Sequence, residues 1–128
     1  MPGASISPGN SGLALVATTG PAGFPLQDAT PNILTWTAPN DGGLHPVKVF
    51  VMGDVTVATT GGQIWTAGTM PDGTGFSFEH DIGSHAGTGY TNPSAKDFLV
   101  KAGTQIAVYQ ATAVSVGACT YWAQLWAS

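Results

Sequence analysis

Glu79, His80, Asp81 and His85 form the densest group of titratable side chains in the sequence. Two imidazoles and two carboxylates are ligand types for a metal ion, but no pair among them has the spacing of a zinc site. On a strand, Glu79 and His80 point to opposite faces. The face of His80 also carries Phe76, Phe78 and Ile82. We therefore expect His80 to be a packed, hydrogen-bonded residue, and we expect neither a metal nor a cofactor.

Three aspartates, Asp41, Asp54 and Asp72, lie next to glycines in segments that look like turns. Calcium loops use such residues, but they place several oxygen ligands close together in sequence. Here each carboxylate stands nearly alone. Aspartate also has a structural reason to occupy turns, because its side chain hydrogen-bonds the backbone two residues further on. We expect this structural role at all three positions.

Two candidate nucleophiles, Ser11 and Cys119, lack the partner residues that catalysis requires. The segment Gly9-Asn10-Ser11-Gly12 is similar to the nucleophile loop of trypsin-like proteases, but only ten residues precede Ser11, too few to supply a base and an orienting acid before it. Cys119 is the only cysteine and has no activating cation nearby in sequence, so it reads as a small buried hydrophobe. Since no coherent acid, base and nucleophile set is found, we predict that the protein is not an enzyme.

The low charge content limits the partners that the protein can have. Only 8% of the 128 residues are charged, and the three cations are all lysines. Nucleic-acid binding and anionic membrane surfaces require basic clusters, so we expect neither partner. A surface so poor in charge is weakly protected against association. Either partner proteins cover much of it, or Thr, Ser, Asn, Gln and Gly keep it hydrated.

The sequence around these residues predicts short strands separated by turns. Apolar residues alternate with polar ones, and Gly, Pro, Asn and Asp punctuate the chain, a pattern typical of β-sandwiches. We expect strands at 13–18, 33–38, 47–52, 55–57, 63–66, 76–82, 98–100, 104–109 and 119–126, with a break at Gly53-Asp54 and loops at 19–32 and 83–97. The prediction is one all-β domain, an antiparallel β-sandwich over residues 13–128.

The first twelve residues, MPGASISPGNSG, differ from the rest in composition. They contain one large aliphatic residue, Ile6, and their prolines and glycines favour an extended chain that is costly to order alone. We predict that residues 1–12 are an arm that binds a neighbouring subunit through Ile6 and Pro8. The segment resembles no signal peptide, and no apolar run has the length of a membrane span. We therefore expect synthesis in the host cytoplasm.

The last expected strand presents an aromatic stripe. Trp122, Gln124 and Trp126 share one face, and Tyr121, Ala123 and Leu125 share the other. If one face belongs to the core, the other faces solvent or a partner. Aromatic side chains are typical of protein interfaces, but they also stack on sugars, and a strand buried on both faces is a third alternative. We predict a partner-binding role for Trp122, Gln124 and Trp126.

Residues 97–109, DFLVKAGTQIAVY, followed by a short turn and an aromatic final strand, resemble the end of tumour-necrosis-factor/C1q-like jelly rolls. In those domains a corner of this kind leads into a strand, and a closing strand follows. The resemblance covers about 30 residues. It implies a jelly-roll-like sandwich that assembles as a homotrimer, with aromatic strand faces around the three-fold axis.

The whole chain, with phrases such as LTWTAPNDG at 34–42, is similar to head decoration (cement) proteins of tailed bacteriophages. This resemblance implies a virion structural protein on the capsid exterior. It would bind neighbouring subunits of the major capsid protein and stabilise the shell without chemistry. The alternative is a receptor- or glycan-binding head of a phage tail or fibre protein, which would need exposed aromatic rings in a groove with polar partners.

Overall fold

The computed structural model describes residues 12–80 and 86–128, and these residues form strands and no helix. The predicted all-β class is confirmed, and no helix able to span a membrane occurs in this part of the chain. Residues 1–11, with Ile6 and Pro8, lie outside the described residues, as do Asp81, Ile82 and His85. The strands are β1 (Ala14–Thr18), β2 (Phe24–Pro25), β3 (Asn32–Thr37), β4 (Leu44–Gly61), β5 (Ile64–Thr69), β6 (Gly75–His80), β7 (Gly89–Tyr90), β8 (Ser94–Lys101), β9 (Gln105–Gln110) and β10 (Val114–Ala127).

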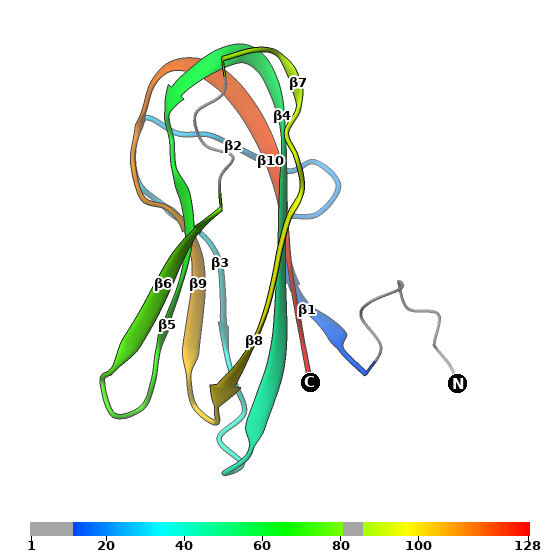
Figure 1. Cartoon of the computed structure of the whole chain (residues 1–128), viewed down its shortest axis with the longest axis vertical. Coiled ribbons are helices and arrows are strands. Elements are labelled where there is room, and N and C mark those ends of the chain that lie inside the picture. The colour runs from blue at the N-terminus through cyan, green and yellow to red at the C-terminus, as the bar shows by residue number, and fades with distance from the viewer. Residues whose placement is uncertain (1–11, 81–85) are drawn as a thin grey trace.

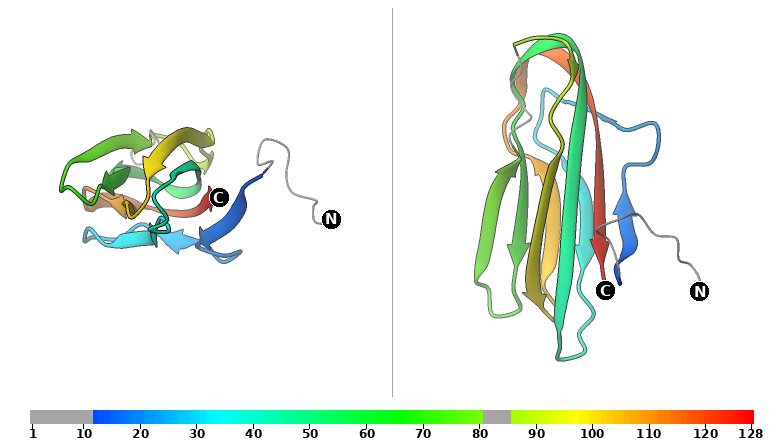
Figure 2. Two further views of the ribbon diagram at one scale, coloured as in Figure 1. Left: turned by 90° about the horizontal axis from the view of Figure 1, so that it is seen from below. Right: turned by 45° about the vertical axis from the view of Figure 1, so that its right-hand side comes forward.

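Two antiparallel sheets pack against each other, which confirms the expected β-sandwich. Sheet A contains β1 and β2 beside β10, then β4, then β7 and β8 on the far side of β4. Sheet B has the order β3-β9-β5-β6. Figure 1 shows β4 and β10 running side by side through most of the length of the molecule. The end-on view in Figure 2 shows both sheets curving around a common interior.

The pairing of β4 with β10 separates the core from the outside. From Cys119↔Val55 to Ala127↔Val47 the register is unbroken. Since opposite residues of an antiparallel pair share a face, one set of pairs points into the sandwich and the next set points out. The inward side chains are fully or almost fully buried: Val47, Val49, Val51, Val55, Cys119, Tyr121, Ala123, Leu125 and Ala127.

The expected strand break at Gly53-Asp54 is wrong, because β4 continues through it. Gly53 lies opposite Tyr121 on the buried face. A Cβ atom there would lie 3.0 Å from Cys119 Sγ and 3.5 Å from the Cβ of Tyr121. The glycine therefore makes room for the thiol of Cys119 and for the side chain of Tyr121 where it leaves the main chain. Asp54 consequently lies within a strand and not in the expected turn.

Two segments expected to be loops contain further pairing. Residues 19–32 include β2, which pairs with β10 through Phe24↔Tyr121 and Pro25↔Thr120. Residues 83–97 include β7 and the first half of β8, which pairs with β4 from Val51↔Ser94 to Leu44↔Lys101. Their weak local preference for strand conceals these elements, because pairing with β10 or β4 overrides it.

An aromatic cluster closes one side of the sandwich, where the edge strands β6 and β8 meet. The ring of Phe98 makes edge contacts with Phe76 and Phe78 at centroid distances of 5.3 and 5.6 Å. Gly68 allows this packing, since a Cβ atom at that position would lie 2.2 Å from the ring of Phe76. The two sheets are thus joined by ring contacts at a side where no strand crosses.

A buried glutamine holds the segment between β2 and β3. The side chain of Gln110 accepts a hydrogen bond from the Gln27 N–H at 2.9 Å and donates to the Gln27 carbonyl at 2.6 Å. It also donates to the Thr112 carbonyl at 3.0 Å. Burying an amide whose donors and acceptor lack partners lowers the stability of the fold. Here three hydrogen bonds hold the irregular segment between β2 and β3 against the end of β9.

We predict that Gln110→Ala lowers the free energy of unfolding by about 2–3 kcal/mol, because it leaves main-chain groups of Gln27 and Thr112 without partners. Urea denaturation measures the effect. Gln105→Ala is the control, since Gln105 lies on the exposed face of the same strand, and it should cost less than about 0.5 kcal/mol. Equal costs for the two variants would contradict the assigned role of Gln110.

Candidate functional site

The outer face of sheet A carries large apolar side chains. Trp122, Gln124 and Trp126 point outward from β10, directly opposite Met52, Phe50 and Lys48 of β4. Leu15 of β1 lies opposite Trp126, and Leu99 of β8 lies opposite Pro46. We call this surface the apolar face; it is formed by Leu15, Leu44, Pro46, Phe50, Met52, Tyr90, Leu99, Trp122, Gln124 and Trp126.

The predicted stripe of Trp122, Gln124 and Trp126 therefore lies together on a half-buried outer surface, and Tyr121, Ala123 and Leu125 belong to the core. The alternative of core on both faces is wrong. The indole N–H of Trp122 donates to the Pro21 carbonyl at 3.0 Å. The indole N–H of Trp126 donates to Gln124 Oε1 at 3.2 Å. Because both donors already have partners, the stripe offers a neighbour mainly apolar surface.

A groove of about 500 Å³ crosses the apolar face beside Trp122. The loop between β1 and β2 forms one wall, and it packs so closely that a Cβ atom at Gly23 would lie 3.0 Å from the Trp122 Nε1 atom. The lining residues are Leu15, Thr18, Gly20, Pro21, Phe50, Met52, Trp122 and Gln124. None of them is charged, so the groove suits an uncharged, largely apolar occupant.

The outer face of sheet B carries mainly small polar side chains. They include Thr35 and Thr37 of β3, Gln105 of β9 and Thr69 of β5, around a depression of about 330 Å³. Trp65 and Tyr109 lie half-buried on the same face.

All seven exposed large apolar side chains of the described residues lie on strands of sheet A, and none lies on sheet B: Leu15, Val16, Leu44, Val57, Tyr90, Leu99 and Val116. Charged side chains accompany them on the outer face of sheet A: Lys48, Asp54, Asp97 and Lys101. The two outer surfaces thus differ in their exposed large apolar side chains.

His80 is buried, as the sequence predicts, and it joins the two sheets. Its Nε2 atom lies 2.6 Å from the hydroxyl of Thr66 on β5, and its Nδ1 atom lies 2.7 Å from the hydroxyl of Ser94 on β8. Hydroxyl groups both donate and accept, so the neutral ring satisfies both contacts. Burial lowers the pKa of His80 to about 4, and the charge of Lys96 acts in the same direction.

These contacts leave His80 no free nitrogen for a metal ion. Glu79 points to the opposite, exposed face of β6, and Asp81 and His85 lie outside the described residues. Among residues 12–80 and 86–128, no group of three His, Cys, Asp or Glu side chains could hold a metal ion.

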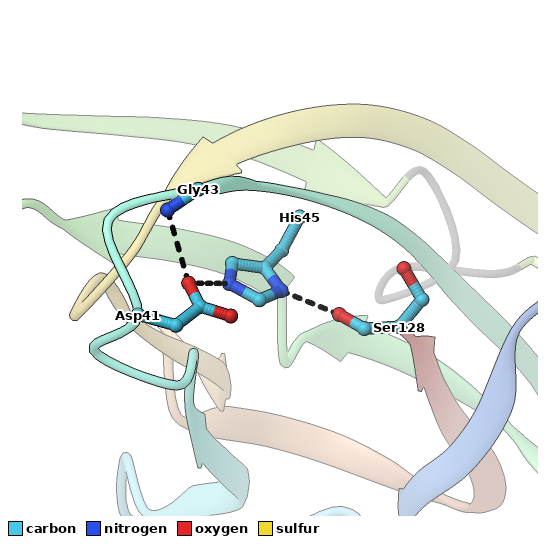
Figure 3. Close-up of polar contacts among 4 residues, drawn as sticks. All are labelled: Asp41, Gly43, His45 and Ser128. Atoms are coloured by element: carbon cyan, nitrogen blue, oxygen red, sulfur yellow. Dashed lines mark hydrogen bonds and ion pairs between the residues drawn. The ribbon is translucent and has the colours of Figure 1, made fainter.

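His45 forms a second polar site, which sequence reasoning missed (Figure 3). Its Nδ1 atom lies 2.5 Å from the main-chain oxygen of Ser128, and its Nε2 atom lies 2.9 Å from Asp41 Oδ1. Both partners only accept, so only the protonated, imidazolium form of the ring can donate to both. The Ser128 oxygen and then Asp41 raise the pKa of His45. The sequence holds no signal for this contact, because Ser128 is 83 residues away.

Two of the three turn aspartates have the expected structural role. Asp41 Oδ1 accepts the Gly43 N–H at 3.0 Å, and this bond, followed by the contact with His45, lowers the pKa of Asp41. Asp72 Oδ1 accepts from the main-chain N–H and hydroxyl of Thr74.

Cys119 is buried, and burial raises the pKa of its thiol to about 11, so it is protonated at neutral pH. This agrees with its interpretation as a small hydrophobe.

We predict that the stabilising effect of His45 disappears as the pH rises. A pKa raised in the folded state stabilises the protein below the unfolded value near 6.5, and the contribution is lost as the pH rises through the folded pKa. The melting temperatures of the wild type and His45→Gln should therefore differ most near pH 6 and converge toward pH 9. A constant difference across this range would show that His45 is not charged in the folded protein.

We predict the opposite behaviour for His80. A pKa lowered from 6.5 to about 4 means that protonation favours the unfolded chain, so stability is lost as the pH falls between these values. Between pH 7 and pH 4, the stability of the wild type relative to His80→Gln should fall by up to about 3 kcal/mol. Chemical denaturation at each pH measures the difference. A relative stability that rises on acidification would mean that the buried ring is protonated.

Comparison with known proteins bears on the fold. No protein-family model matches the sequence, and no curated protein has a significant sequence match. Solved structures from infectious bursal disease virus are similar: the VP2 subviral particle (12% identity, TM-score 0.57), the T13 viral particle (13%, 0.58) and the Gx strain (16%, 0.53). Each match covers 99% of this chain but only 35–37% of the viral one. The chain therefore has the β-sandwich fold found in about a third of the length of these viral-particle proteins.

Proposed function

We propose that the protein is a non-enzymatic structural component of a virus particle that binds neighbouring subunits of the shell through the apolar face. The observation that carries this proposal is that all exposed large apolar side chains of the described residues lie on strands of sheet A. A contiguous apolar patch on one side of a small domain marks a docking surface. The likeness in fold to proteins of viral particles supports the same role.

In its specific form, the proposal is a decoration protein on the exterior of a bacteriophage capsid. Sheet A would lie against the major capsid protein, and sheet B would face solvent. Binding across the junction of two subunits would stabilise the shell by burial alone.

The satisfied indole groups favour a protein partner over a sugar at the apolar face. A glycan site needs aromatic rings accompanied by free polar groups, whereas the N–H groups of Trp122 and Trp126 donate within the molecule. The low charge content of the chain, 8% of its residues, also suits a packed assembly. We propose a homotrimer as the unit that binds, which mass measurement under native conditions would test.

A receptor- or glycan-binding head of a phage tail or fibre is the second candidate, and one observation favours it. The depression on sheet B is lined by the side chains of Asn32, Thr35, Thr37, Thr69 and Gln105. Trp65 and Tyr109 lie opposite each other in the next row of the same sheet. Hydroxyls and amides next to aromatic rings are groups that bind sugars. In this reading sheet B, and not sheet A, would make the functional contact.

We predict that Leu99→Asp weakens binding to the particle at least tenfold, because Leu99 is 63% exposed on the apolar face and the change places a charge in the contact. Binding of labelled protein to purified particles that lack it measures the effect. Thr35→Asp is the matched control, since it adds the same charge to the exposed face of sheet B. Loss of binding with Thr35→Asp alone would instead favour the glycan- or receptor-binding function.

A further inference from the structure

The groove beside Trp122 is a separate feature of the apolar face, with an occupant of its own. Two strongly exposed apolar residues, Leu44 and Leu99, lie near the opposite end of sheet A, at β4 positions well before Phe50 and Met52. Tyr90, which is more exposed still, lies opposite Asp54, two positions beyond Met52. The groove has a wall, which is formed by the loop that carries Gly20 and Pro21. A broad subunit surface fits the exposed end, whereas a groove with a wall fits a single extended chain.

The eleven residues that precede Gly12 have the composition of such a chain. They contain no charged side chain, and the groove lining contains none either. Their apolar side chains include Ile6, Pro2 and Pro8, separated by small residues. Aromatic-lined grooves bind extended proline-containing segments, because such segments lose little entropy on docking. Trp122 and Phe50 provide the aromatic lining here.

We propose that the groove of one copy binds residues 1–11 of a second copy of this chain. Ile6 would occupy the space between Phe50, Met52 and Trp122, and the prolines would lie along the aromatic rings. The contact goes beyond the proposed function, since it joins copies of the protein to one another. It leaves the end of the apolar face around Leu44 and Leu99 available to the shell.

The direction of β1 favours a second copy over the chain's own groove. Ala14 pairs with Ala127, whereas Thr18, at the other end of β1, pairs with Gln124 beside the groove. The segment before Ala14 therefore joins β1 beside Leu15, which lines one end of the groove. To lie along the rest of its own groove it would have to reverse direction and pass back along β1. Eleven extended residues span up to about 36 Å, which is enough to reach a neighbouring molecule.

Isotope-filtered NMR of the full-length protein tests this contact directly. One sample mixes copies carrying methyl-labelled isoleucine with unlabelled copies, and Ile6→Leu identifies the Ile6 signal. The expected result is a set of nuclear Overhauser effects between the Ile6 methyl group of labelled copies and the rings of Trp122 and Phe50 of unlabelled copies. Effects confined to a single copy, or none between Ile6 and the groove, would overturn the proposal.

Two variants connect the contact to assembly. Ile6→Asp, in the segment, and Met52→Glu, in the groove, should each weaken self-association at least tenfold by sedimentation velocity and remove the intermolecular effects. Ile6→Leu keeps the apolar anchor and should retain both. Leu99→Asp should leave both unchanged, so a failure of particle binding is distinguishable from a failure of this contact. Unaltered self-association of Ile6→Asp and Met52→Glu would refute the proposal.

Discussion

The antiparallel pairing of β4 with β10 is the contact on which the rest of the structure depends. Its unbroken register from Cys119 to Ala127 assigns every side chain of two long strands to the interior or the exterior. A shift of one residue would exchange these faces. If β4 slipped while β10 kept its place, Val49 would face outward and Phe50 would enter the core. The composition of the apolar face thus follows directly from the pairing that builds the hydrophobic core.

Two histidines in this framework have opposite protonation preferences, and their hydrogen-bond partners explain why. His80 lies between two hydroxyl groups, which can donate to a neutral ring and accept from it. His45 lies between a main-chain oxygen and a carboxylate, and only a doubly protonated ring satisfies both. His80 ties sheet B to sheet A, whereas His45 ties the end of β10 to the start of β4. The stabilising effect of His45 is therefore lost as the pH rises, whereas that of His80 is lost as the pH falls.

Alternation and turn residues were sufficient to predict the β-sandwich, the inward placement of His80 and the outward placement of Trp122, Gln124 and Trp126. These predictions depend on period-two geometry, which is local. Features that depend on long-range pairing escaped prediction. Gly53 looked like a strand break because the side chains that require a glycine there, Cys119 and Tyr121, are more than 60 positions away in the chain. Likewise, nothing local indicates that β1 and the loop after it form the wall of a groove beside Trp122.

The separation of core and exterior also explains how this fold can occur at 12% identity in a viral-particle protein nearly three times as long. The inward positions need only apolar side chains of suitable volume, so many sequences satisfy them. The outward positions are not constrained by the core, and an exposed Leu99 or Trp126 contributes little to folding. Such residues increase the risk of aggregation when nothing covers them. Their concentration on strands of sheet A is the feature that the proposed contact with a partner would explain.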